Sequence, residues 1–402
     1  MTQPLDGIRV LEIGHFIAGP FAGMLLGDMG ADVIKIEHPG RGDQARATPP
    51  IINGESASFA VLNRNKRSIA LDLKQKAARE LVLEMAAKSD VFLENNRPGS
   101  MKSLGLGPED IRAVNPKIVY VSASGFGQTG PYSRKAGVNL IIEAFAGTLS
   151  VTGSPDDMPM RPGIQTADIF GALFATYAVL CGLVSVLRDK GGRIADVSLV
   201  EASIAAAAWE TAGYLATGEV PTRIGHQHRL NCPYQLFETA DGVFLAIGAP
   251  NDNLFAELMK VLGLEIHLQS ELFSTYSLRK ANEKRLLEII MPAILLKNSV
   301  ELEKMLAAVG VPCSRVNNYE ELFADPHVEA RKVLVEVNHP RIGNTRLVRN
   351  PVVFDEHSPV IRRPAPLLGQ HSKEILQQFG YEESVVQKLS EDGIVFLGSA
   401  VA

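Results

Sequence analysis

Strand-like and helix-like segments alternate along the first half of the chain, and this alternation constrains the fold more than any other feature. Short runs rich in Val, Ile and Leu recur, and stretches with helical character separate them. The predicted strands cover residues 8–14, 32–37, 68–73, 90–94 and 118–124. Consecutive βαβ units build a mostly parallel sheet with helices on both faces. We therefore expect an α/β fold.

The character of the sequence changes after residue 220, where Pro221 opens a polar stretch. Residues 234–248 predict a hairpin that turns at Asp241-Gly242. Helical segments follow, and the last part is rich in Pro, Arg and Val. A chain of 402 residues is long for one core. We predict a large domain over 1–220, a small α+β domain over 221–325, and an extended segment over 326–402 that returns to the large domain.

Composition limits the partners and the cellular location of the chain. Hydrophobic residues make up 46% and charged residues 21%, with a net charge of -5. Because no basic stripe is present, neither nucleic acid nor a membrane surface is an expected partner. Cys181, Cys232 and Cys313 lie far apart without metal-ligand spacing, so we expect no disulfide and no metal site. The first residues lack a basic-then-apolar signal pattern, which predicts a cytoplasmic protein.

Asp168 directly precedes the long apolar run 169–187, which predicts a buried helix. The free N–H groups and the dipole at a helix start favour a charged carboxylate. Such a carboxylate can cap the helix, or it can attack an electrophile. The sequence around Asp168 alone leaves both roles open.

Two further patterns concern ligand binding. Gly14, Gly19 and Gly23 are spaced too widely for a dinucleotide fingerprint, so a tight turn that packs a helix on the sheet explains them better. Basic and amide residues at 63–67, Lys74 and 95–102 lie beside predicted strand ends, where doubly wound sheets bind ligands. They fit either a phosphate-bearing ligand or a solvated surface.

An ordered set of short motifs spans nearly the whole chain. These motifs lie at residues 5–11, 18–20, 30–37, 65–69, 94–95, 125–131 (Gly-Phe-Gly-Gln-Thr-Gly-Pro), 166–168 (Thr-Ala-Asp) and 366–371 (Pro-Leu-Leu-Gly-Gln-His). With them the chain resembles the class III CoA-transferases, the group of formyl-CoA:oxalate transferase, carnitine CoA-transferase and α-methylacyl-CoA racemase. Within this group it resembles the succinyl-CoA-dependent dicarboxylate CoA-transferases.

The resemblance implies a Rossmann-like large domain, a smaller α+β domain, and ring-like chains that interlock as a homodimer. It implies Asp168 as the catalytic residue and coenzyme A, or an acyl-CoA, as a substrate, with no prosthetic group. The residues that it places at the CoA are Phe16, Ile17, His38, Leu71, Lys74, Asn95, Asn96, Arg97, Lys102 and Ser103.

The expected reaction moves CoA from an acyl-CoA thioester to a free carboxylic acid. Asp168 would form a mixed anhydride and then an aspartyl-CoA thioester, and backbone N–H groups at the helix start would stabilise the oxyanions. Positive charge for a second acceptor carboxylate could come from four side chains: Arg161, Arg223, His226 and Arg229.

Two alternatives share this fold. An acyl-CoA racemase needs an acid and a base on opposite faces of the α-carbon. The racemases of the family carry a His-Asp pair where this chain has Val138-Asn139, and a Glu where its loop reads Gly-Ala-Pro-Asn at 248–251. A non-catalytic acyl-CoA-binding protein is the second alternative.

Overall fold

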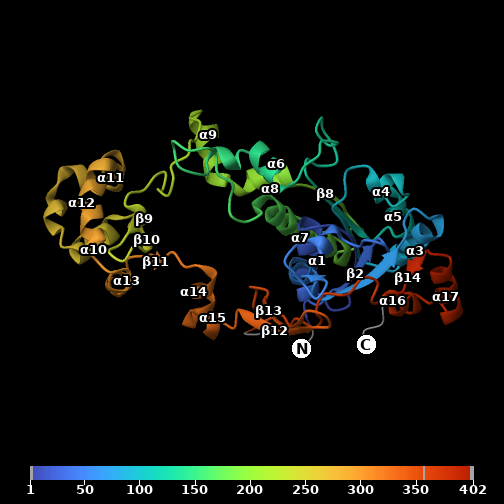
Figure 1. Ribbon diagram of the computed structural model, residues 1–402. Coiled ribbons are helices and arrows are strands. Elements are labelled where there is room, and N and C mark those ends of the chain that lie inside the picture. Colours follow the sequence, from blue (N-terminus) through green and yellow to red (C-terminus); the bar gives the residue numbers. More distant parts are fainter. Residues whose placement is uncertain (1–2, 356–357, 399–402) are drawn as a thin grey trace. The chain divides into compact units, whose positions relative to one another are not determined.

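The chain folds into two compact units, as a computed structural model that describes residues 3–355 and 358–398 shows (Figure 1). Unit 1 contains Met1–Thr148, Pro162–Gly218 and Ala330–Ala402. Unit 2 contains Leu149–Arg161 and Glu219–Glu329. Residues 149–161 therefore group with the later unit, although they precede residues 162–218 of unit 1.

A seven-stranded sheet forms the centre of unit 1, in the order β14-β5-β2-β1-β6-β7-β8. Its strands are β1 (Arg9–Ile13), β2 (Asp32–Glu37), β5 (Lys66–Leu71), β6 (Val91–Glu94), β7 (Val119–Ser124), β8 (Ile194–Ser198) and β14 (Val395–Phe396). All neighbouring pairs are parallel except β14 with β5. The predicted mostly parallel α/β sheet is confirmed.

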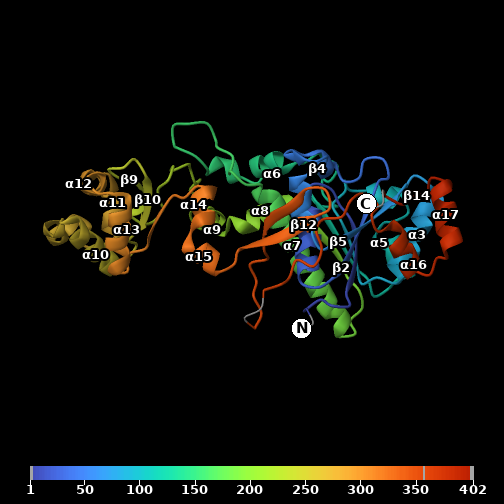
Figure 2. The same ribbon diagram turned by 60° about the horizontal axis from the view of Figure 1, so that its bottom comes forward.

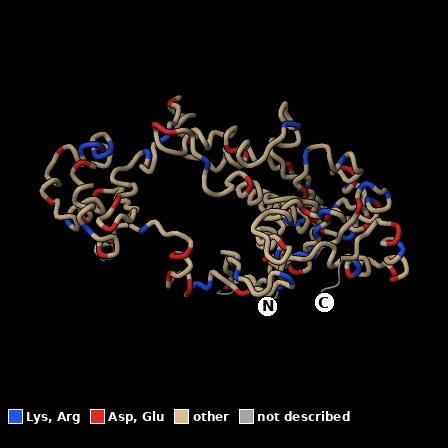
Figure 3. Tube along the Cα trace, viewed as in Figure 1, with Lys and Arg blue, Asp and Glu red and all other residues tan. Residues whose placement is uncertain are grey.

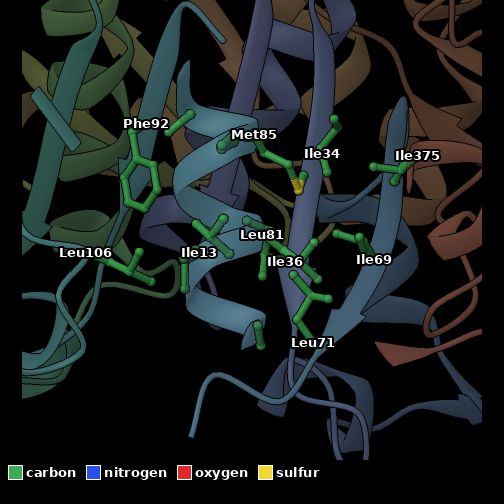
Figure 4. Packing of buried hydrophobic residues seen from close by; sticks show 14 of the residues in the cluster. Ile13, Ile34, Ile36, Ile69, Leu71, Leu81, Met85, Phe92, Leu106 and Ile375 are labelled. Atoms are coloured by element: carbon green, nitrogen blue, oxygen red, sulfur yellow. The ribbon is translucent and has the colours of Figure 1, made fainter. Parts of the chain in front are cut away.

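Helices cover both faces of this sheet. The helices of unit 1 include α1 (Ala18–Asp28), α2 (Ala57–Leu62), α3 (Lys76–Ala87), α4 (Ser100–Ser103), α5 (Pro108–Val114), α6 (Asn139–Phe145), α7 (Thr166–Leu187), α8 (Leu199–Ala206), α9 (Ala208–Thr217), α16 (Ser372–Gln378) and α17 (Glu383–Glu391). Alternate strand residues point to opposite faces. Leu11 and Ile34 accordingly pack against α3 and α16, whereas Val10 and Val33 pack against α1 and α7. Figure 4 shows the first of these two cores.

Helix α7 differs from the buried helix that its sequence predicts. Ala175, Val179 and Leu183 face the core, but Tyr177 is 64% exposed and Leu187 is 81% exposed. By length and composition alone α7 could cross a membrane, but one such helix is weak evidence for a membrane span. It packs on α1, α8 and β7. The prediction of a buried helix holds for one face of α7 only, because an apolar run does not reveal which of its faces the fold covers.

The C-terminal segment is more structured than the extended return that its composition predicts. It contains a hairpin of β12 (Leu334–His339) and β13 (Gly343–Val348), then α16, α17 and β14. Strand β14 adds the antiparallel edge to the sheet, and α16 and α17 lie beside α3 in both views (Figure 2). The segment thus completes the sheet and its core.

Unit 2 has its own core. A three-stranded antiparallel sheet consists of β9 (Tyr234–Glu238), β10 (Phe244–Gly248) and β11 (Cys313–Arg315). The helices are α10 (Asp252–Leu262), α11 (Tyr276–Ala281), α12 (Glu283–Leu295), α13 (Ser299–Ala308) and α14 (Tyr319–Ala324), and α15 (Pro326–Ala330) follows at its end. Phe237, Leu245 and Ile247 from the strands pack with Leu258 and Ile290 from the helices. The predicted hairpin at 234–248 is present.

Candidate active site

The predicted CoA-binding residues follow the carboxyl ends of four parallel strands. Because β5, β2, β1 and β6 are neighbours, their carboxyl ends lie side by side at one edge of the sheet. Phe16 and Ile17 follow β1, His38 follows β2, Leu71 and Lys74 lie at the end of β5, Asn95, Asn96 and Arg97 follow β6, and Lys102 and Ser103 lie in α4. Ligands of doubly wound sheets bind at this edge.

These side chains differ in how they could meet a ligand. Lys74, Arg97 and Lys102 are exposed, so their charges are available to phosphate groups. Leu71 is fully buried in the core, so only its backbone could contact a ligand. Ser103 lies on the surface, where its hydroxyl donates to the Ser100 carbonyl. A phosphate-bearing ligand would therefore meet the lysines and the arginine first.

The loop after β1 is held by several hydrogen bonds. Phe16 adopts a φ of 60°, a conformation that is uncommon for a residue with a side chain, and its ring is 49% exposed. Its N–H donates to Asp43 Oδ1 at 3.0 Å. The Asn95 amide bonds both backbone groups of His15, at 2.8 and 2.9 Å. The loop is therefore fixed with the Phe16 ring turned outward.

A fully buried ion network supports this loop. Lys35 Nζ lies 2.8 Å from Glu12 and 2.9 Å from Asp43, and Lys66 Nζ lies 2.7 Å from Glu12. Lys35 also donates to the Gly14 carbonyl at 2.9 Å. Burial alone would raise the pKa of Asp43, but the Lys35 charge and the hydrogen bond from the Ala45 N–H hold it well below its usual range. Asp43 is thus a permanent anion under ordinary conditions.

Asp168 lies in the first turn of α7, in the connection between β7 and β8. This connection joins parallel neighbours, so α7 runs back across the sheet and begins at the edge where the strand-end residues gather. Burial, together with the charge of Glu143, raises the pKa of Asp168 to about 6. Burial and the like charge of Glu143 thus oppose the expected preference of the helix start for the charged form.

Two side chains of α6 occupy the free backbone groups at the start of α7. Asn139 Oδ1 accepts from the N–H groups of Ala167 at 3.1 Å and Asp168 at 3.3 Å. Glu143 accepts from the N–H of Thr166 at 3.1 Å. These three N–H groups are therefore not free to stabilise an oxyanion, which contradicts that part of the expected mechanism. An isolated polar pair, four residues apart in an apolar run, was the sequence signal for this cap.

The residues predicted for a second carboxylate all belong to unit 2. The guanidinium of Arg223 donates to the backbone carbonyls of Ser154, Pro155 and Asp157, so most of its donors are occupied. Arg229 donates to one backbone carbonyl, and Arg161 is exposed. His226 lines a cavity of about 540 Å³ on the hairpin, and the remaining lining residues include His228, Tyr234, Gln235, Gly248 and Ser314.

Basic and acidic residues are interspersed along both units (Figure 3). Among the residues that the structure describes, no three His, Cys, Asp or Glu side chains gather as a metal site would require. The three cysteines are free thiols.

Comparisons with known proteins identify the family of the chain. The model of CoA-transferase family III matches residues 5–372. The succinyl-CoA:glutarate CoA-transferase of Mus musculus is 37% identical over 395 residues, which are 98% of this chain and 90% of that protein. The succinate–glutarate CoA-transferase of Agrobacterium fabrum is 37% identical over 382 residues, 93% of this chain and 95% of that protein.

A solved structure has the same fold. The CAIB/BAIF family protein of Brucella suis superimposes with a TM-score of 0.83 at 34% identity, and the match covers 94% of this chain and 100% of that chain. The family match extends over both units and over most of the C-terminal segment. The chain belongs to CoA-transferase family III and is an enzyme of that class.

Proposed function

We propose that Asp168 is the nucleophile that carries CoA from an acyl-CoA donor to a free carboxylic acid. The observation that carries this proposal is its position, a half-buried carboxyl at the start of α7 on the sheet edge where Lys74, Arg97 and Lys102 follow parallel strands. A pKa of about 6 keeps Asp168 mostly ionised at neutral pH. Its basicity is at least that of ordinary carboxylic acids, which suits reversible exchange with them.

The reaction consists of four exchanges without net consumption of a proton. The Asp168 carboxylate attacks the thioester carbonyl, the C–S bond breaks, and CoA leaves as a thiolate. The thiolate attacks the Asp168 carbonyl of the mixed anhydride and expels the donor acid as its carboxylate. The acceptor carboxylate then attacks the aspartyl-CoA thioester and releases the thiolate. In the last step the thiolate attacks the acceptor's acyl carbon and frees the Asp168 carboxylate.

We propose succinyl-CoA as the donor and a dicarboxylate as the acceptor. The activities that name both similar CoA-transferases support this, since each pairs succinate or succinyl-CoA with glutarate. A screen of CoA donors against mono- and dicarboxylic acids, read by mass spectrometry, tests the assignment. Activity confined to monocarboxylic acceptors would contradict it.

The central test is replacement of Asp168 by Asn or Ala. We expect both variants to lose CoA exchange by several orders of magnitude, because neither has a carboxylate at this position to carry the acyl group. Both should keep the melting temperature of the unchanged protein. Glu201→Gln is a matched control, since it removes an exposed carboxyl from the first turn of α8. Near-normal exchange by Asp168→Asn would contradict the proposed role.

We propose that two chains form the interlocked homodimer that the family resemblance implies. Exposed apolar side chains on α7 and α9 support a protein partner, with Tyr177 at 64%, Leu187 at 81%, Trp209 at 72% and Leu215 at 81% exposure. Light scattering should give twice the chain mass of 43.5 kDa. A monomer at micromolar concentration would contradict the assignment.

A further inference from the structure

The start of α7 depends on two residues that lie on one face of α6. Asn139 and Glu143 are four positions apart, so their side chains project in the same direction. Together they accept from the first three N–H groups of α7, and Glu143 Oε1 also accepts from the Thr166 hydroxyl at 2.5 Å. Helix α6 therefore fixes the turn that carries Asp168.

Capping of α7 alone does not explain why residue 143 is a glutamate. Its side chain has no exposed surface, and its second oxygen, Oε2, is buried without a hydrogen-bond partner. A neutral glutamine could accept the same bonds from Thr166 through its one carbonyl oxygen. Burial of a carboxylate with an unpaired oxygen costs free energy that a neutral amide would largely avoid. The charge of Glu143 therefore has a role beyond holding the helix.

We infer that Glu143 is a positioning residue of the CoA-transfer site, which fixes the first turn of α7 with one oxygen and acts on the Asp168 carboxyl with its charge. This inference rests on the proposed nucleophilic role of Asp168. Acylation of Asp168 removes one of two neighbouring negative charges. Glu143 thus favours the acylated enzyme over the free carboxylate, and it makes the ionised Asp168 a stronger base.

The other titratable groups on α7 and on the elements packed against it do not have this effect. Those elements are α1, α6, α8, β7 and β8. Besides Glu143, these elements carry four acids and phenols: Asp28, Tyr120, Asp196 and Glu201. Helix α7 itself also carries Tyr177 and Cys181, and Asp28 is bound by Arg64 and Asn65. Burial is the larger cause of the raised pKa of Asp168. Among the described residues, Glu143 is the one whose charge raises it further.

Two substitutions change the charge near Asp168 in opposite directions while each keeps an acceptor oxygen. Glu143→Gln removes the negative charge, and Asn139→Asp adds one beside the N–H of Asp168. Steady-state kcat/KM is measured from pH 4.5 to 8 with one donor and one acceptor. We expect the acidic limb to move down by about one pH unit in Glu143→Gln and up by a similar amount in Asn139→Asp. Substrate acids titrate equally in all profiles, so only differences between variants count.

A purely structural role predicts a different result. Thr166→Val loses one hydrogen bond to Glu143 but keeps the charge, so its profile should be scaled by one factor without a shift of the limb. If Glu143→Gln and Asn139→Asp behave in that way too, Glu143 is only a helix cap and the inference is wrong. Asp168→Asn separates the two proposals. If that variant is active, Asp168 is not the nucleophile, whatever the pH profiles of the other variants show.

Discussion

At the scale of single residues, Asp43 connects the buried ion network to the loop that carries Phe16. It bonds Lys35 Nζ through one oxygen and the Phe16 N–H through the other. In Asp43→Asn the single amide oxygen cannot serve both, so with that oxygen on Lys35 the loop loses one of the hydrogen bonds that hold it. We expect KM for the acyl-CoA to rise about tenfold, the effect of one hydrogen bond to a charged group.

Glu12→Gln is the matched control for this prediction. It also weakens a carboxylate bonded to Lys35, but the Phe16 N–H donates to Asp43 and Glu12 instead binds Lys35 and Lys66. Both variants should lower the melting temperature, since each disturbs a buried pair. Only Asp43→Asn should raise KM, and an equal rise in both variants would show that the network acts through stability alone.

At the scale of elements, helix α7 depends on small residues for its close packing on the sheet. A Cβ at Gly182 would lie 2.4 Å from Val119 Cγ1 of β7. We therefore expect Gly182→Ala to lower the free energy of unfolding by about 1–3 kcal/mol, the cost of overpacking. In α9, Gly213 has nothing within 4 Å of such a Cβ, so Gly213→Ala should raise stability by about 0.5–1 kcal/mol. Denaturant melts that rank the two variants the other way would contradict the packing of α7.

The strands of the large sheet could be predicted because their apolar residues are continuous and local. Residues 32–37 match β2 in full, and the other predicted strands differ from the structure by a few residues at their ends. The protonation of Asp168 could not be predicted. It depends on Glu143, which lies 25 positions earlier in the chain and comes close only when α6 folds against α7. The exposure of one face of α7 could not be predicted either, since it depends on which elements cover the helix.

At the scale of the whole molecule, His371 joins the C-terminal segment to the central sheet. Its N–H donates to the Ser68 carbonyl, and its Nδ1 accepts from the Ser68 N–H at 3.2 Å. Burial lowers the pKa of His371 to about 4, and the charges of Arg363 and Arg67 act in the same direction. The unfolded chain takes up this proton near pH 6.5, so stability is full above that pH and falls as the pH drops toward 4.

We expect this histidine to contribute about 1 kcal/mol to the loss of stability between pH 6.5 and 5, after allowance for its partial exposure. His371→Asn keeps an acceptor for the Ser68 N–H but cannot be protonated in this range. Melting temperatures across this window should therefore fall less steeply in His371→Asn than in the unchanged protein. Equal slopes would show that His371 is free to titrate in the folded state.

The division into residues 1–220, 221–325 and 326–402 and the cytoplasmic location stay predictions.

The central claim is that the Asp168 side chain becomes covalently attached first to the acyl group and then to CoA. The most direct measurement is mass spectrometry of the protein after incubation with succinyl-CoA alone, without acceptor. The proposed reaction predicts an added mass on the peptide that contains Asp168, which hydroxylamine removes and which Asp168→Asn lacks. A donor that is consumed in the presence of an acceptor, with no such adduct at any time or pH, would contradict it.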